Sequence, residues 1–130
     1  MRSQSYRDVI SCLSLMTASL AMAQSTSAVG SAIKGKEIYD ARCSACHSVD
    51  DNRVGPMHLG VFGRKAGSVK SYSYSEALTN SKVVWSRETM TAWLRNPEAL
   101  IPGQRMGYSM DNAQDRDDVV AYLATLKAIK

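Results

Sequence analysis

Two cysteines and a histidine near the middle of the chain form the pattern Cys-x-x-Cys-His, at Cys43, Cys46 and His47. Two thiols separated by two residues can each add to one vinyl group of the same porphyrin, and the adjacent histidine is then directed under the iron. The pattern therefore predicts covalent attachment of one c-type haem through the two cysteines, with His47 as an axial ligand of the iron.

Other kinds of site also use paired cysteines. A structural zinc ion needs four ligands, and His58 is the only other histidine in the chain. A thioredoxin-type redox pair follows a strand and opens a helix, whereas this pattern closes a predicted helix. These two alternatives and a chance arrangement fit the surroundings of the motif less well than haem does.

The N-terminal residues have the features of an export signal. Two arginines precede an apolar run over residues 9–23, which ends in the small-x-small pattern Ala-Met-Ala of a peptidase site. The run is shorter than the about 20 apolar residues of a comfortable transmembrane helix, and a retained anchor is the alternative. We expect a signal peptide at residues 1–23, a flexible lead-in at residues 24–31 and one domain at residues 32–130, located in the periplasm.

Charge and composition limit what the domain can do alone. The net charge of +4 falls to +3 once Arg2, Arg7 and Asp8 leave with the signal peptide. This mild excess does not argue for a nucleic-acid partner. A small chain with a single phenylalanine buries only a modest apolar core, so a bound apolar cofactor would supply part of it.

The elements that must position the motif are helices and long loops. Residues 48–74 contain four glycines and a proline and show no sustained period, which is unusual unless the segment wraps something. The expected helical segments are a helix from residue 32 into the motif, a short helix at residues 75–80, a helix behind the N-cap Ser86 that stops at Asn96, and a last helix capped by Asp111 and Gln114 whose apolar stripe reaches Ile129. The predicted class is all-α, with three main helices, short helices and long loops around one haem.

Further short motifs follow the attachment pattern in a fixed order. They are Val54-Gly55-Pro56, Phe62-Gly63-Arg64-Lys65, Tyr72-Ser73-Tyr74, Val84-Trp85, Asn96-Pro97, Ile101-Pro102-Gly103-Gln104-Arg105-Met106 and Ala121-Tyr122-Leu123. Each is weak alone, but the ordered set closely resembles the class I, mitochondrial-type cytochromes c and their bacterial periplasmic members, from about Gly35 to the C-terminus. The resemblance implies the cytochrome c fold.

The resemblance implies that Met106 is the second axial ligand of the iron. A thioether is a soft donor that favours ferrous iron, so ligation by histidine and methionine raises the reduction potential. Three other methionines compete for this role. They are Met57, Met90 and Met110. Met90 lies on a helix face and is expected in the core, and Met110 is the main alternative because it follows Met106 by four residues.

Other haem contacts are also implied by the resemblance. Pro56 matches the proline whose carbonyl accepts the second ring N–H of the proximal histidine, which fixes the orientation of that ring. Tyr74 and Trp85 match residues that bind an inner haem propionate, and Arg64 matches a nearby cation that offsets the propionate charge. Simple core packing is the alternative role of Trp85. Trp93 stands where the family usually has a tyrosine whose hydroxyl reaches the methionine sulfur.

Two more features concern packing. Gly35 and Tyr39 match one side of the contact between the terminal helices, and Val119 and Tyr122 match the other. His58 falls at a position that is normally apolar. We expect it to be a surface or hydrogen-bonded residue and not a ligand.

The resemblance implies a monomeric electron carrier and not an enzyme. Its partners would be redox proteins such as a quinol-oxidising cytochrome bc complex, a terminal oxidase, a photosynthetic reaction centre or a periplasmic dehydrogenase, with only transient contact at a membrane surface. Arg42, Arg53 and Arg105 match cationic positions around the haem edge, while Glu98 and Ala99 dilute that charge. The alternatives are a peroxidase-like haem enzyme or small-ligand binder with a labile Met106, and a fixed subunit of a larger oxidoreductase.

Overall fold

Residues 29–128, which the computed structural model describes, form five helices and a long irregular loop that joins the first helix to the second. The helices are α1 (Ala32–Arg42), α2 (Glu76–Asn80), α3 (Arg87–Arg95), α4 (Pro97–Leu100) and α5 (Ala113–Leu123). In these residues the only strand-like pairing is a single bridge between Lys65 and Val84. The all-α class is thus confirmed, while the predicted signal peptide, most of the lead-in and Ile129 lie outside the described residues.

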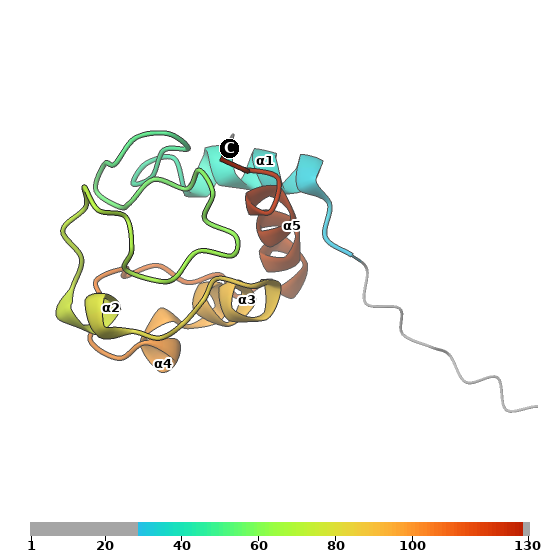
Figure 1. The fold of residues 1–130 in the computed structure, drawn as a ribbon. Helices are drawn as coiled ribbons and strands as arrows, with labels where there is room; N and C mark the ends of the chain where they lie inside the picture. The colour runs from blue at the N-terminus through green and yellow to red at the C-terminus, as the bar shows by residue number, and fades with distance from the viewer. Residues whose placement is uncertain (1–28, 129–130) are drawn as a thin grey trace, which may run out of the picture.

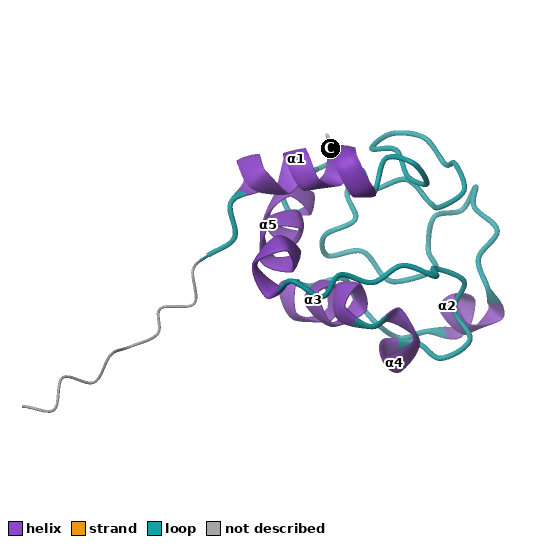
Figure 2. Ribbon diagram, turned by 180° about the vertical axis from the view of Figure 1, so that it is seen from behind, coloured by secondary structure: helices purple, strands orange, loops and turns teal. Residues whose placement is uncertain are grey.

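The terminal helices α1 and α5 cross and pack against each other, as Figures 1 and 2 show from opposite sides. Gly35 of α1 lies at the crossing, where a Cβ atom would lie 1.9 Å from the Asp118 carbonyl oxygen. Tyr39, one turn later, is 3% exposed and meets the Tyr122 ring edge to face, with ring centroids 5.2 Å apart. The predicted contact between the terminal helices is therefore present, and only glycine can occupy position 35 at the crossing.

Helix α3 begins where its sequence predicts. The Ser86 side chain accepts a hydrogen bond from the Thr89 N–H, and the Thr89 hydroxyl accepts one from the Ser86 N–H, which together form a capping box. Asn96 ends α3 as expected, but the chain continues directly into α4, which was not predicted. Pro97 occupies its first turn and the Asn96 side chain accepts from the Ala99 N–H, so a local signal for this short helix was present.

Helix α5 differs from its prediction at both ends. Its N-cap is Asn112 and not Asp111, because the Asn112 side chain accepts from the Asp115 N–H at 3.0 Å, and Gln114 instead binds the Asp118 carboxylate. The helix ends at Leu123, short of the predicted stripe. The Leu126 carbonyl accepts from the Gly60 N–H at 2.6 Å, so a contact distant in sequence holds the chain outside the helix.

The segment between α1 and α2 is the predicted long loop, with turns but no helix. Its backbone bonds lead to distant parts of the chain: Gly63 donates to the Trp85 carbonyl at 2.7 Å, and Ala66 donates to the Val83 carbonyl at 2.8 Å. Figure 1 shows that this loop begins at the end of α1 and runs to α2, which lies far from the α1–α5 crossing. Within residues 29–128, none of the helices has the length and apolar character needed to cross a membrane.

Candidate functional site

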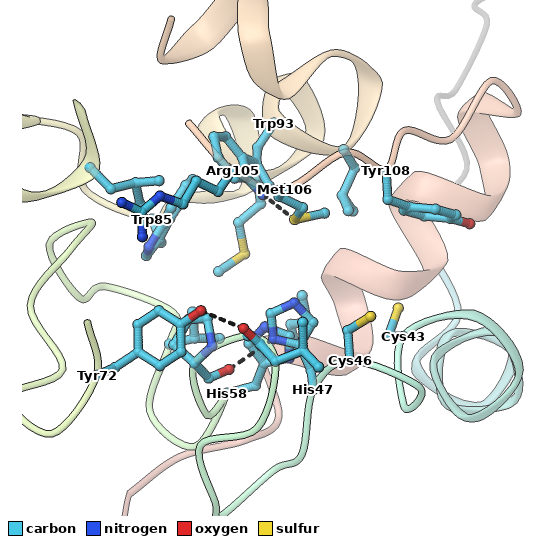
Figure 3. A pocket seen from close by; sticks show the side chains of 18 of the residues that line it. Cys43, Cys46, His47, His58, Tyr72, Trp85, Trp93, Arg105, Met106 and Tyr108 are labelled. Carbon is cyan, nitrogen blue, oxygen red and sulfur yellow. Dashed lines mark hydrogen bonds between the residues drawn. The ribbon is translucent and has the colours of Figure 1, made fainter. Parts of the chain in front are cut away.

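The structure brings all nine predicted site residues to the wall of one cavity of about 680 Å³. Figure 3 shows this cavity from close by and labels several of them. They come from the end of α1, the long loop, the segment before α3, α3 itself and the loop after α4. The residues in question are Cys43, Cys46, His47, Pro56, Arg64, Tyr74, Trp85, Trp93 and Met106. Residues scattered over more than sixty positions of sequence therefore share one site.

The attachment motif forms a tight turn at the end of α1. Cys43 is the C-cap of the helix, and its carbonyl accepts from the N–H groups of Cys46 at 3.1 Å and His47 at 2.9 Å. Both thiols are free, and Cys46 is the more exposed of the two. Burial raises the pKa of the Cys43 thiol to about 11, so this sulfur is a neutral thiol at neutral pH.

The loop after the motif fixes the imidazole of His47. Its Nδ1 lies 2.8 Å from the Pro56 carbonyl oxygen, and because a carbonyl only accepts, Nδ1 carries the proton. The other ring nitrogen, Nε2, is left with a lone pair for a metal. Burial lowers the pKa of His47 against the opposing effect of the Pro56 carbonyl, which keeps the ring in the neutral form that binds iron.

Gly55 makes this arrangement possible because its backbone lies directly against the ring. A Cβ atom at residue 55 would lie 2.2 Å from Cε1 of His47, far inside van der Waals contact. The Gly55 N–H donates to the Cys46 carbonyl at 2.8 Å, which ties the loop back to the motif. The Gly-Pro pair thus packs on the imidazole and orients it.

His58 also belongs to this side of the cavity, although it was expected only as a surface or hydrogen-bonded residue. Its Nδ1 lies 3.0 Å from the Tyr39 hydroxyl, and its ring stacks on the His47 ring with centroids 4.1 Å apart. Burial, with a smaller effect of His47, lowers the pKa of His58 to about 3 and keeps the ring neutral. A hydrogen bond of His58 was expected, although its partner Tyr39 was not. The stack of His58 on His47 was not expected, because it depends on a contact between loop segments that no local sequence pattern indicates.

The opposite side of the cavity carries Met106 and Trp93 (Figure 3). The Trp93 indole Nε1–H donates to the Met106 sulfur at 3.1 Å. The indole thus makes the hydrogen bond that a tyrosine hydroxyl usually makes in the family that the sequence resembles. Because Trp93 lies on α3, a helix side chain and not a flexible loop holds the thioether.

The competing methionines occupy other positions. Met110 is 2% exposed in the apolar core and does not line the cavity, and its N–H donates to the Leu94 carbonyl. Met90 is buried in the core, as expected for its helix face, and also reaches the cavity wall. Met57 does not line the cavity. Of these methionines, Met106 is the one that Trp93 holds at the cavity wall.

Arg64, Tyr74 and Trp85 line another part of the cavity. The Arg64 guanidinium donates to the carbonyls of Leu59 at 2.8 Å and Met57 at 2.9 Å, and it forms no ion pair with any acid of residues 29–128. Burial lowers the pKa of Arg64 and raises that of the nearby Tyr74. A partly buried cation without an anion favours a ligand that brings carboxylates.

These residues match the vinyl groups, the iron, a propionate and the apolar face of a haem group. The thiols suit its vinyl groups, the Nε2 of His47 and the sulfur of Met106 suit its iron, and Arg64 suits a propionate. Much of the remaining wall is apolar, as a porphyrin face requires, with Val61, Leu78, Leu94 and Leu123 among its side chains.

Cationic residues also lie at the cavity. Arg42 and Arg105 are exposed and line it, whereas Arg53 donates to the Ser44 carbonyl at 2.6 Å and does not line it. Arg42 forms an ion pair of 3.0 Å with Asp115 of α5, so part of its charge is compensated. Arg105 forms no ion pair with any residue in the described range.

Comparison with known proteins agrees with this site. The family model described as cytochrome c matches residues 32–127. Cytochrome c2 of Rhodomicrobium vannielii is 38% identical and aligns over 87% of this chain and 93% of its own, and cytochrome c2 of Rhodopila globiformis is 38% identical over 75% and 95%. Cytochrome cH from Methylobacterium extorquens superposes with a TM-score of 0.71 and 37% identity, over 74% of this chain and 99% of its own. The chain belongs to the class I cytochrome c family, which binds haem c covalently.

Proposed function

We propose that this protein is a one-electron carrier whose haem c is attached to Cys43 and Cys46 and whose iron is held by His47 and Met106. One observation carries the proposal: each ligand is fixed by its own hydrogen bond, His47 to the Pro56 carbonyl at 2.8 Å and Met106 from the Trp93 indole at 3.1 Å. An iron with both axial positions filled has none left for a substrate.

The residues around the site serve rapid and reversible electron transfer. Bound haem supplies an iron that alternates between the ferric and ferrous states. The hydrogen bonds of His47 and Met106 would hold both side chains in place in either state, so that little of the protein would have to rearrange. Cys46 and Arg105 are exposed beside the cavity, so a partner that docks there would lie close to a haem attached to Cys46.

We place the carrier in the periplasm of a bacterium, exported by the signal peptide at residues 1–23. Its partners would be a quinol-oxidising cytochrome bc complex and a terminal oxidase, a photosynthetic reaction centre or a periplasmic dehydrogenase. The support is the sequence of the leader and the similarity to two cytochromes c2. Weak, charge-assisted contacts at Arg105 would suit a carrier that must leave its partner quickly.

The state of the iron tests the proposal. We expect the oxidised holoprotein at neutral pH to show the weak absorption band near the red end of the visible spectrum that reports coordination of ferric iron by methionine. We also expect the reduced form to resist carbon monoxide. Loss of the band together with rapid carbon monoxide binding would refute the carrier function and favour a ligand-binding or peroxidase-like protein.

A further inference from the structure

The ring of His58 lies face to face with the ring of His47. The ring centroids are 4.1 Å apart and the planes are inclined by 19°, so the two imidazoles are in van der Waals contact over their faces. If the His47 ring turned about its bond to Cβ, its edge would be driven into this neighbour. The contact therefore restricts rotation of the His47 plane.

His58 is itself held on several sides. The Tyr39 hydroxyl and His58 Nδ1 share a hydrogen bond of 3.0 Å, and the two rings meet edge to face with centroids 5.6 Å apart. The His58 N–H donates to the Ser48 carbonyl at 3.1 Å, which fixes its backbone. Tyr39 is 3% exposed and packs on Tyr122 of α5. His58 is thus anchored in the rigid contact between α1 and α5.

The hydrogen bond from His47 to Pro56 leaves the tilt of the ring plane to packing contacts, which the Gly55 backbone and the flat His58 ring supply. A single bond at the ring edge fixes Nδ1 and selects the tautomer, but it allows the plane to tilt around the bond direction. A flat partner at the ring face, inclined by only 19°, defines the plane itself. An aliphatic side chain at residue 58 would fill the same space without specifying a plane.

We propose that Tyr39 and His58 are positioning residues that set the plane of the axial His47 imidazole. Tyr39 holds His58, and the face of His58 holds His47. The inference rests on the proposed function, since it takes His47 as an iron ligand. The orientation of an axial imidazole determines how its orbitals meet those of the iron, so these residues tune the electronic state of the ferric protein.

The test uses the full holoprotein with the variants His58→Leu, His58→Phe and Tyr39→Phe. The readouts are the hyperfine-shifted haem methyl resonances in proton NMR, the g-anisotropy in electron paramagnetic resonance and the reduction potential. Val120→Ala is the matched control, because Val120 is fully buried in the core and does not line the cavity. Circular dichroism confirms folding for every variant.

We expect His58→Leu to change the spread of the methyl resonances and the g-anisotropy, while His58→Phe, which keeps a flat face, stays close to the parent protein. Tyr39→Phe removes only the hydroxyl and should broaden or double the resonances, as His58 gains freedom to rotate. Val120→Ala should lower stability and leave the spectra unchanged. Parent-like spectra for His58→Leu, or equal changes in His58→Leu and His58→Phe, would overturn the inference.

The same measurements separate this inference from the proposed function. If the parent protein lacks the red absorption band, ligation by His47 and Met106 fails, whatever the variants show. If the parent shows the band and the residue 58 and 39 variants match it, ligation stands and the positioning role fails.

Discussion

The hydrogen bond from Trp93 to the Met106 sulfur offers a quantitative test of how the distal side is tuned. The indole N–H donates at 3.1 Å and so draws electron density from the thioether. A thioether that donates less stabilises ferric iron less, which keeps the reduction potential high. Trp93→Phe removes the donor and retains an aromatic ring, so the potential should fall.

The size of the fall follows from the strength of the bond. A typical hydrogen bond contributes about 0.5–1.5 kcal/mol net, and a thioether is a weak acceptor, so the lower part of that range applies, about 0.5–1 kcal/mol. For a one-electron couple about 1.4 kcal/mol corresponds to about 59 mV. If most of the loss falls on one oxidation state, Trp93→Phe should lower the potential by about 20–40 mV.

Spectroelectrochemical titration of the holoprotein at fixed pH and salt measures this shift. Trp93→Tyr is the informative companion, because a phenol O–H is a donor in the same place and should recover most of the potential. The red absorption band should persist in both variants, since Met106 remains available as a ligand. An unchanged potential in Trp93→Phe, or an equal fall in both variants, would refute the role of the indole N–H.

Other parts of the site give further predictions. Met106→Ala should abolish the red absorption band and lower the reduction potential by far more than Trp93→Phe does. Met110→Ala should keep the band. Because Met110 is buried in the core, this variant should lower the free energy of unfolding by about 2–5 kcal/mol in denaturant titrations. Gly55→Ala should sharply lower the yield of haem-loaded protein, since the added Cβ would lie 2.2 Å from the axial imidazole, and Gly107→Ala, with open space at its Cβ, should not. In stopped-flow measurements, Arg105→Glu should slow electron transfer to an acidic partner and weaken the dependence of the rate on salt concentration. If the rate of the parent protein does not change with salt concentration, Arg105 has no role in docking.

The sequence predicted features that depend on neighbouring residues and missed those that depend on distant ones. Ser86 marks the start of α3 because its cap is closed within three residues. The end of α5 was wrong because the bond between the Gly60 N–H and the Leu126 carbonyl lies outside any local window. The cap of the same helix was wrong by one residue, because Asp111 and Asn112 are both good N-caps and only the backbone geometry chooses between them.

The same distinction holds within the site. Spacing alone indicated the attachment motif, and the order of short motifs indicated Pro56 and Met106. The hydrogen bond from Trp93 to Met106 could be suspected, because an indole N–H replaces a hydroxyl, but only the structure gives its geometry. The stack of His58 on His47 joins two rings eleven residues apart through a loop with no regular period, so composition and periodicity carry no signal for it.

The two sides of the cavity are tuned by separate sets of residues, and this has a measurable consequence. Trp93 acts on Met106 from α3, while His58 acts on His47 from the long loop, and the contacts of the two pairs share no residue. Perturbations without shared partners add in free energy within about 0.3–0.5 kcal/mol, and here the iron would be the only partner that the two pairs have in common. The potential of a protein carrying both Trp93→Phe and His58→Leu should therefore equal the sum of the single shifts within about 20 mV. A larger deviation in the titrated potential would mean that a change at one axial ligand moves the other, and the separate control of the two sides would have to be abandoned.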